Sequence, residues 1–245
     1  TDPAGNTSLP GTGTVSADIT APVVALDDVL TNDSTPALTG TVNDPTATVV
    51  VNVDGVDYPA VNNGDGTWTL ADNTLPALAD GPHTITVTAT DAAGNVGNDT
   101  AVVTIDTVAP VVSFTDASTN DTTPALTGTI DDPTATVVVT VDGVDYPAVN
   151  NGDGTWTLAD NTLPVLADGP HTVSVTATDV AGNVSTPVTG TVTVDATAPT
   201  LAITTDDLAL AAGEDANITF TFSEAVAGFD VSDITVVGGT LTGLT

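Results

Sequence analysis

The sequence predicts an all-β protein made of tandem β-sandwich domains, and three observations lead to that prediction. Hydrophobic residues make up 40% of the 245 residues, mostly Val, Ile, Leu and Ala, and Thr is the commonest polar residue; β-branched residues favour strands. Short alternating runs are separated by turn residues at the spacing typical of a sandwich. A long segment also recurs almost unchanged, which is the signature of a repeat array. No window of the sequence has a convincing helical period.

The recurring segment has a constant offset of 88 positions. Residues 31–96 realign on residues 119–184 with only eight differences. The phrase TDPAGN at 1–6 also matches TDAAGN at 90–95 and TDVAGN at 178–183. We therefore expect the chain to begin in the tail of a preceding repeat.

A second phrase, D-x-x-A-P, recurs where the units join, at Asp18–Pro22, Asp106–Pro110 and Asp195–Pro199. Proline cannot donate to a strand ladder, so each proline is expected at the start of a domain's first strand. Beyond residue 199 the sequence changes character. The expected units are the tail of a preceding repeat at 1–19, repeat 1 at 20–107, repeat 2 at 108–196, and a truncated domain of a different subtype at 197–245.

Repeat 1 is expected to contain seven strands, each bounded by turn residues. The first follows the linker proline, the second begins at a Thr-Pro pair, and the third and fourth flank Asp54-Gly55, which favours a two-residue hairpin. The fifth follows Asn-Asn-Gly-Asp-Gly, the sixth follows Asp-Gly-Pro-His, and the last precedes the next linker. The predicted strands are Val23–Leu26, Pro36–Val42, Thr48–Val53, Val56–Val61, Thr67–Ala71, Thr84–Thr90 and Thr100–Ile105. Seven strands in a unit of this length is the count of an immunoglobulin-like sandwich.

Charge and composition exclude several functions. The chain has no Lys or Arg and a formal net charge of −32, so it lacks the cations that bind nucleic acids and anionic lipids. The absence of Cys excludes disulfides, thiolate nucleophiles and Cys-type zinc sites. No apolar run is long enough for direct membrane insertion. Ser34 is replaced by Thr122 in the second repeat and no nucleophile-elbow sequence occurs, so we expect no enzymatic activity.

The aromatic and histidine residues of the repeats admit two interpretations each. Trp68 and Trp156 lie in T-W-T-L, where alternation favours core packing over a platform that stacks sugars. His83 and His171 follow Asp-Gly-Pro at the start of a strand. We expect each to be a corner residue that bonds upstream backbone, with a metal ligand or catalytic base as the alternative.

Several phrases together resemble a known family. TND-x-TPALTG, DGTWTLA, LADGPHT, TATD-x-AGN and D-x-x-AP are similar to the bacterial Ig-like repeats of large Bap- and RTX-type biofilm surface adhesins. The closing ITFTFSEAVAGFDVSDITVVGG resembles another bacterial Ig-like family of the same proteins. The resemblance implies a spacing role, export to the bacterial cell surface and structural Ca²⁺ at domain junctions.

Acidic and amide side chains are expected to supply those junction sites, because Ca²⁺ takes six to eight oxygen ligands. The loops at the N-terminal end of a sandwich meet the incoming linker. The candidate ligands at the repeat 1–repeat 2 junction are Asp106, Asp131, Asp132, Asp179 and Asn183, approached by Asp28, Asn32 and Asp33 from repeat 1. The equivalent candidates for repeat 1 are Asp18, Asn43, Asp44, Asp91 and Asn95. The alternative is that Asp-x-x-Gly-Asn is a tight turn whose polar side chains bond local backbone.

The expected function is a non-catalytic extender segment of a secreted adhesin, whose partners are the neighbouring repeats of the same chain. Near-identical repeats favour this hypothesis, since a spacer gains length by duplication whereas a receptor site needs one copy. A module that binds glycans or other ligands is the first alternative. An accessory domain of a secreted enzyme is the second.

Overall fold

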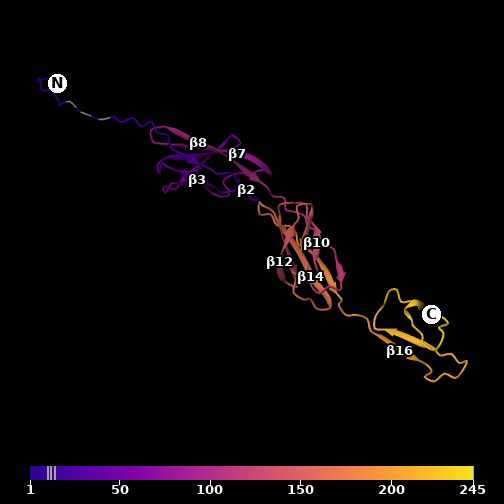
Figure 1. The fold of residues 1–245 in the computed structure, drawn as a ribbon. Helices are drawn as coiled ribbons and strands as arrows, with labels where there is room; N and C mark the ends of the chain where they lie inside the picture. The colour runs from indigo at the N-terminus through magenta and orange to yellow at the C-terminus, as the bar shows by residue number, and fades with distance from the viewer. Residues whose placement is uncertain (10, 12, 14, 245) are drawn as a thin grey trace.

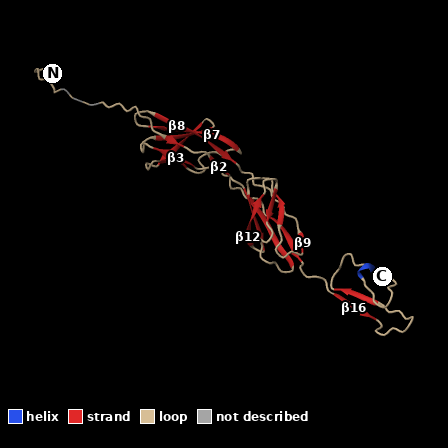
Figure 2. Cartoon of the chain, in the orientation of Figure 1, coloured by secondary structure: helices blue, strands red, loops and turns tan. Residues whose placement is uncertain are grey.

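The computed structural model describes residues 1–9, 11, 13 and 15–244, and almost all regular structure in that part of the chain is β. Positions 10, 12 and 14 of the predicted segment 1–19, and position 245 of 197–245, lie outside the described residues. Two sandwiches follow one another along an elongated chain, and a smaller two-stranded sheet lies beyond them (Figures 1 and 2). The predicted immunoglobulin-like β-sandwich is confirmed as the fold of the two repeats.

Repeat 1 contains eight strands: β1 (Val24–Ala25), β2 (Val29–Thr31), β3 (Leu38–Val42), β4 (Thr48–Val53), β5 (Val56–Asn62), β6 (Thr67–Leu70), β7 (Gly81–Thr90) and β8 (Val96–Ile105). Their order is β1-β3-β6-β5-β4-β7-β8-β2. All neighbours are antiparallel except β2 and β8, which run parallel. Strand β5 joins the two layers, because Val56 to Ala60 pair with β4 whereas Val61 and Asn62 pair with β6.

Repeat 2 repeats this arrangement with seven strands: β9 (Ala117–Thr119), β10 (Leu126–Thr129), β11 (Thr136–Val141), β12 (Val144–Asn150), β13 (Thr155–Leu158), β14 (Gly169–Thr178) and β15 (Val188–Val194). An isolated bridge between Val112 and Ile130 stands where repeat 1 has the β1–β3 pair. The last strand starts later than its counterpart β8. Before it, the Ser185 backbone N–H donates to the Ala177 carbonyl and the Ser185 hydroxyl oxygen accepts from the Ala177 N–H, in place of regular strand pairing. Pro187 then precedes β15, as expected of a residue that cannot donate to the ladder.

Each sandwich has its own core around one tryptophan. Trp68 and Trp156 are 0% exposed, and each indole Nε1 donates to a backbone carbonyl, that of Ala25 at 3.2 Å and that of Ser113 at 3.0 Å. The alternating pattern of β4 buries every second residue against this centre. The prediction that the tryptophans pack in the core is confirmed, and the sugar-platform alternative is wrong for these two side chains.

All seven predicted strands of repeat 1 overlap an observed strand, but the last two are predicted too short and an eighth strand is absent from the prediction. Thr48–Val53 is reproduced by β4 without change. A strand was missed at β2, whose partner β8 is far away in the sequence. Strand β7 begins at Gly81 instead of Thr84, because Gly81 pairs with Ile105, and β8 begins at Val96 instead of Thr100, because Val96 pairs with Thr90.

The segment beyond repeat 2 has little regular structure. It contains β16 (Leu201–Thr205), β17 (Ile218–Phe222) and a 3₁₀ turn, η1 (Val231–Asp233). Leu201 pairs with Phe222 and Ile203 with Phe220, so one face of the two-stranded sheet is apolar. Phe229 packs on Phe220 and Phe222 at ring-centroid distances of 5.3 and 5.0 Å.

Candidate functional site

The linker Asp106–Pro110 leaves strand β8 and is held by the domain that precedes it. The Asp80 carboxylate accepts hydrogen bonds from the Thr107 backbone N–H at 3.1 Å and from the Thr107 hydroxyl at 2.9 Å. Asp80 lies directly before β7, in the loop that contains Leu-Ala-Asp-Gly-Pro-His. Repeat 1 therefore holds the second residue of the linker to its neighbour through two hydrogen bonds.

The domain that follows holds the same linker. The Asn183 amide Nδ2 donates to the main-chain carbonyl of Asp106 at 2.7 Å and to Asp179 Oδ2 at 2.8 Å. Asp179 Oδ1 in turn accepts from the Asn183 backbone N–H at 2.8 Å. Asn183 is 9% exposed, so this bond is made largely out of water. The T-D-x-A-G-N phrase of one domain thus contacts the D-x-x-A-P phrase that leads into it.

The same contact recurs at the N-terminal end of repeat 1. Asn95 Nδ2 donates to the carbonyl of Asp18 at 3.1 Å and to Asp91 Oδ2 at 2.7 Å. The first residues of the chain form the same turn, with Asn6 Nδ2 donating to Asp2 Oδ2 at 2.7 Å. The sequence predicts that each Asp–Asn pair lies beside its linker, and the structure brings these residues into contact.

Three of the other candidate ligands close local turns. Their Oδ1 atoms accept from the backbone N–H two positions ahead: Asp33 from Thr35 at 2.8 Å, Asp44 from Thr46 at 2.8 Å and Asp132 from Thr134 at 2.7 Å. Asp131 Oδ1 instead accepts from the backbone N–H of Val111, just after the linker, at 2.7 Å. Asp28 accepts from the backbone N–H of Val102 in β8 at 2.8 Å. The tight-turn interpretation of Asp-x-x-Gly-Asn holds for Asp91–Asn95 and Asp179–Asn183, because Asp91 and Asp179 accept backbone N–H bonds within their own turns.

Four of the candidates for repeat 1 line one depression of about 260 Å³. They are Asp18, Asn43, Asp44 and Asp91, and the rest of its lining is Thr20, Ala21, Pro22 and Pro45. An all-oxygen set of carboxylates and an amide is the donor chemistry that Ca²⁺ prefers. Both hydrogen bonds to Asp44 go to Oδ1. Within the described ranges, no group of three or more His, Cys, Asp or Glu side chains is close enough to hold a metal on its own, so carbonyl, amide or water oxygens would have to complete a site.

Repeat 1 also reaches the junction from its C-terminal end. A side chain at Gly182 would lie 3.5 Å from the Asn32 amide nitrogen, so Asn32 approaches the Asp179–Asn183 turn as expected. The φ of Gly182 is +98°, which favours glycine there.

Hydrogen bonding within the two Asp-x-x-Gly-Asn turns favours the ionised forms of Asp91 and Asp179. The Asn95 amide and the backbone of the same turn lower the pKa of Asp91. Burial opposes ionisation of Asp179, but the Asn183 side chain and backbone N–H groups outweigh it and lower its pKa. At neutral pH the Asp side chains of both turns are therefore negatively charged acceptors.

The histidines occupy the predicted corners. His83 Nε2 lies 2.8 Å from the Ala79 carbonyl and His171 Nε2 lies 2.8 Å from that of Ala167, which confirms a bond to upstream backbone. Sequence reasoning missed Asp80 and its counterpart Asp168, which accepts from the Ala196 N–H at 2.9 Å. The signal that could have found them is the recurrence of Leu-Ala-Asp-Gly-Pro-His at 78–83 and 166–171, at the start of β7 and of β14.

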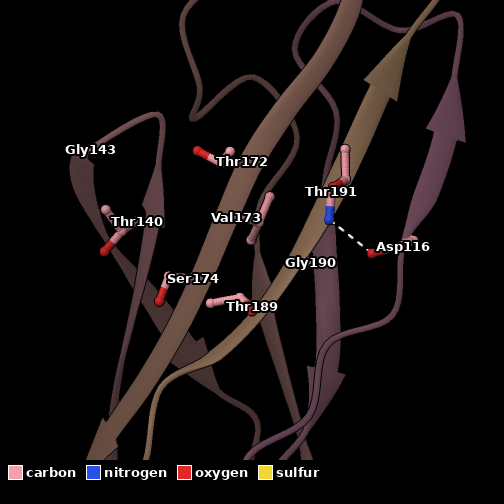
Figure 3. Close-up of a pocket in the computed structure, with 9 residues that line it drawn as sticks. All are labelled: Asp116, Thr140, Gly143, Thr172, Val173, Ser174, Thr189, Gly190 and Thr191. Atoms are coloured by element: carbon pink, nitrogen blue, oxygen red, sulfur yellow. Dashed lines mark hydrogen bonds between the residues drawn. The ribbon is translucent and has the colours of Figure 1, made fainter.

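A second depression lies on the sheet surface of repeat 2 (Figure 3). Its volume is about 620 Å³, and it is lined by Asp116, Thr140, Gly143, Thr172, Val173, Ser174, Thr189, Gly190 and Thr191. Asp116 accepts from the Thr191 backbone N–H at 2.8 Å, which joins the segment before β9 to β15.

Among the described residues, no helix is long and apolar enough to cross a membrane.

Comparison with known proteins places this fold in a sequence family. A family model described as "Bacterial Ig-like domain" matches residues 24–107 and 112–196, and a second model with the same description matches 195–245. Halomucin of Haloquadratum walsbyi is 32% identical over 203 residues, which are 79% of this chain and 2% of halomucin. The chain thus spans only a small fraction of that relative.

Three solved structures are also similar. The fibronectin(III)-like modules of Clostridium thermocellum CbhA have 16% identity and a TM-score of 0.43, covering 71% of this chain and 93% of theirs. A tetra-tandem repeat from the extending region of a large adhesion protein has 29% identity and a TM-score of 0.33, covering 82% and 56%. A Ca²⁺-stabilised adhesin of an Antarctic bacterium has 25% identity and a TM-score of 0.36, covering 83% and 57%. On the strength of the family matches, which cover both repeats and the segment that follows them, this chain belongs to the bacterial Ig-like domain family.

Proposed function

We propose that this chain is a non-catalytic extender segment of a secreted bacterial cell-surface adhesin of the Bap/RTX type, which acts in cell adhesion and biofilm formation. The units of the extender are the tail at 1–19, the two repeats at 20–107 and 108–196, and the truncated domain at 197–245. The observation that carries the proposal is the five-residue linker Asp106–Pro110, held by Asp80 from one side and by Asn183 from the other. A linker that is hydrogen-bonded to both domains restricts how far one domain can rotate relative to the next.

Each intact repeat would add one domain length to the array. Strands rise about 3.3 Å per residue, so the ten-residue strands β7 and β14 give each sandwich a long axis of roughly 33 Å before loops and linker. The near-identity of the two repeats supports a spacing role.

Ca²⁺ at the junctions is the second part of the proposal. The chain has a net charge of −32 without Lys or Arg, and Asp80 and Asp179 lie on the two sides of the linker. A bound cation would offset the repulsion between such carboxylates. The oxygen-lined depression at Asp18, Asn43, Asp44 and Asp91 supports a site in front of repeat 1. Asn95, which bonds Asp18 and Asp91, would belong to the same site. By equivalence, Asp106, Asp131, Asp132, Asp179 and Asn183 would serve the next junction, with Asp33 in a supporting position.

Calorimetric titration of the intact chain with CaCl₂ tests the metal, and small-angle scattering with and without chelator tests the rod. We expect Ca²⁺ binding with a Kd of about 10⁻⁴–10⁻³ M, the range of extracellular modules, and a shorter maximum dimension after chelation. Asp44→Ala with Asp91→Ala should remove the heat of the site in front of repeat 1. Absence of heat would refute the calcium sites, and a compact or randomly bent chain in both states would refute the extender.

A further inference from the structure

Each intact repeat carries one histidine, and in both repeats the two ring nitrogens face hydrogen-bond acceptors. His83 Nδ1 lies 3.1 Å from Asp54 Oδ2 and its Nε2 lies 2.8 Å from the Ala79 carbonyl oxygen. In repeat 2, His171 Nδ1 lies 2.6 Å from Asp142 Oδ2, and Nε2 again faces a carbonyl. A carbonyl and an ionised carboxylate only accept, and a neutral imidazole has one N–H donor. Both contacts are therefore satisfied together only by the doubly protonated imidazolium.

The surroundings of His83 offer one negative partner and no competing cation. The β4–β5 hairpin contributes Asp54, the loop before β7 contributes the Ala79 carbonyl and the neighbouring Asp80, and β8 contributes Val103, which is uncharged. The His83 side chain is 15% exposed. Because the chain has no Lys or Arg, this imidazolium is the sole side-chain cation of its repeat.

The same contacts hold the pKa of each histidine above its ordinary value. The Ala79 carbonyl raises the pKa of His83, burial opposes that rise, and Asp54 adds to it. For His171 the Ala167 carbonyl contributes most and Asp142 contributes next.

The histidine is also linked to the connection between domains. Ala79, which His83 holds, is followed directly by Asp80, which holds the backbone and hydroxyl of Thr107. In repeat 2 the residue after Ala167 is Asp168, which accepts from Ala196 and Thr197 at the next linker. The loop before β7 or β14 is thus bonded to the histidine through its alanine carbonyl and to the outgoing linker through its aspartate.

We propose that the histidine of each repeat is a protonated latch that makes the repeat's hold on its outgoing linker depend on pH. The stabilisation is fully present below the unfolded histidine pKa of about 6.5 and is lost as pH rises through the raised folded-state pKa. Above that point the ring keeps one donor, one of its two contacts is lost, and the loop with Asp80 or Asp168 loosens. The latch uses contacts within one repeat and requires neither calcium nor an adhesin.

Histidine NMR on the full chain in chelator tests the protonation state. We expect both ring nitrogens of His83 and His171 to titrate as an imidazolium, with apparent pKa values above those of the same residues in 8 M urea. Asp54→Asn should lower the value for His83 and leave that of His171 unchanged, and Asp142→Asn should do the reverse. A folded-state pKa equal to or below the unfolded one would overturn the latch.

Distances between spin labels test the link to the linker. The chain has no Cys, and Val61 and Val149 are equivalent positions that are 64% and 62% exposed, so Val61→Cys with Val149→Cys reports on the repeat 1–repeat 2 junction. We expect a narrow distance distribution at pH 6 that broadens as His83 deprotonates. His171 titrates in the same range, but its contact is to the Ala167 loop, which bonds the linker that follows repeat 2.

Matched histidine variants complete the test. His83→Gln should give the broad distribution at both pH values, whereas His171→Gln, which acts on the following linker, should keep it narrow at pH 6. Circular dichroism verifies that both variants remain folded, and Asp54→Asn provides a second, milder release of the latch. A distribution that does not change while the rings deprotonate, or one that responds equally to both Gln variants, would overturn the coupling.

Discussion

The side-chain amide of Asn183 donates a 2.7 Å hydrogen bond to the main-chain carbonyl of Asp106, and this contact spans 77 positions in the sequence. Asn95 makes the equivalent bond to Asp18 over the same separation. Two phrases that recur far apart in the chain, A-G-N and D-x-x-A-P, are therefore two sides of one contact. The linker is specified by the domain it enters as well as by its own prolines.

Replacing Asn183 with Asp separates a hydrogen-bond role from a metal role. Aspartate cannot donate to the Asp106 carbonyl and places a second negative charge beside Asp179. In chelator we expect Asn183→Asp to lower the free energy of unfolding of repeat 2 by about 1–3 kcal/mol, the cost of leaving a buried polar group unpaired. Urea denaturation followed by Trp156 fluorescence measures it.

The control for this change is Asn95→Asp, which should weaken repeat 1 and leave repeat 2 unaffected. Millimolar Ca²⁺ adds a second readout, because an extra carboxylate strengthens a calcium site. A variant that is as stable as the parent in chelator would show that the amide donor contributes nothing to the junction.

Each tryptophan anchors its own sandwich. Trp68→Ala and Trp156→Ala should each destabilise the repeat concerned by about 3–5 kcal/mol, the range for deleting a buried aromatic side chain. Both indoles are 0% exposed and bonded to backbone. Thermal melts of the two single variants measure the loss, with Val61→Ala, at a position 64% exposed, as a control that should change little. Unchanged melting of the Trp variants would contradict the core assignment.

The segment beyond repeat 2 should be cleaved first by an aromatic-directed protease. Leu201, Ile203 and Ile218 are 44%, 60% and 47% exposed on its small sheet, so few buried contacts oppose local opening. We expect early cuts after Phe220, Phe222 or Phe229 and survival of a fragment that holds both repeats. Mass spectrometry of a time course identifies the sites, and equal survival of the two parts would contradict this expectation.

The alternating strands could be predicted from sequence because burial of every second residue is a local pattern, as in β4 and β6. Strand β2 could not, since it has three residues and owes its existence to parallel pairing with β8. The early start of β7 was hidden for a similar reason: Gly81-Pro82 reads locally as a turn, yet both residues pair across to β8.

Contacts at the junction could also be predicted only in part. The acidic and amide side chains predict that Asp106 lies near Asp179 and Asn183, and these residues do lie together. The contact itself goes to a main-chain carbonyl, which every residue has, so no side-chain pattern could reveal it. The role of Asp80 was hidden because its partner, Thr107, is a linker residue with no distinctive signature.

Salt should stabilise this chain through screening, in a way that Ca²⁺ does not imitate. With 32 acidic residues and no Lys or Arg, the folded state carries repulsion that the expanded chain relieves. Raising NaCl from 0.1 to 1 M shortens the screening length from about 10 Å to about 3 Å, so the melting temperature of both repeats should rise. Millimolar CaCl₂ adds little ionic strength. Any stabilisation that it gives at constant NaCl must therefore come from binding, worth at most about 2.7 kcal/mol at 100 times Kd.

The distance between the spin labels at positions 61 and 149 distinguishes screening from binding, because a monovalent ion screens charge without bridging oxygens of two domains. We expect NaCl to raise melting temperatures with little change in the width of that distribution, and Ca²⁺ to narrow it. If the melting temperature falls with NaCl, charge repulsion is not what limits the stability of these repeats.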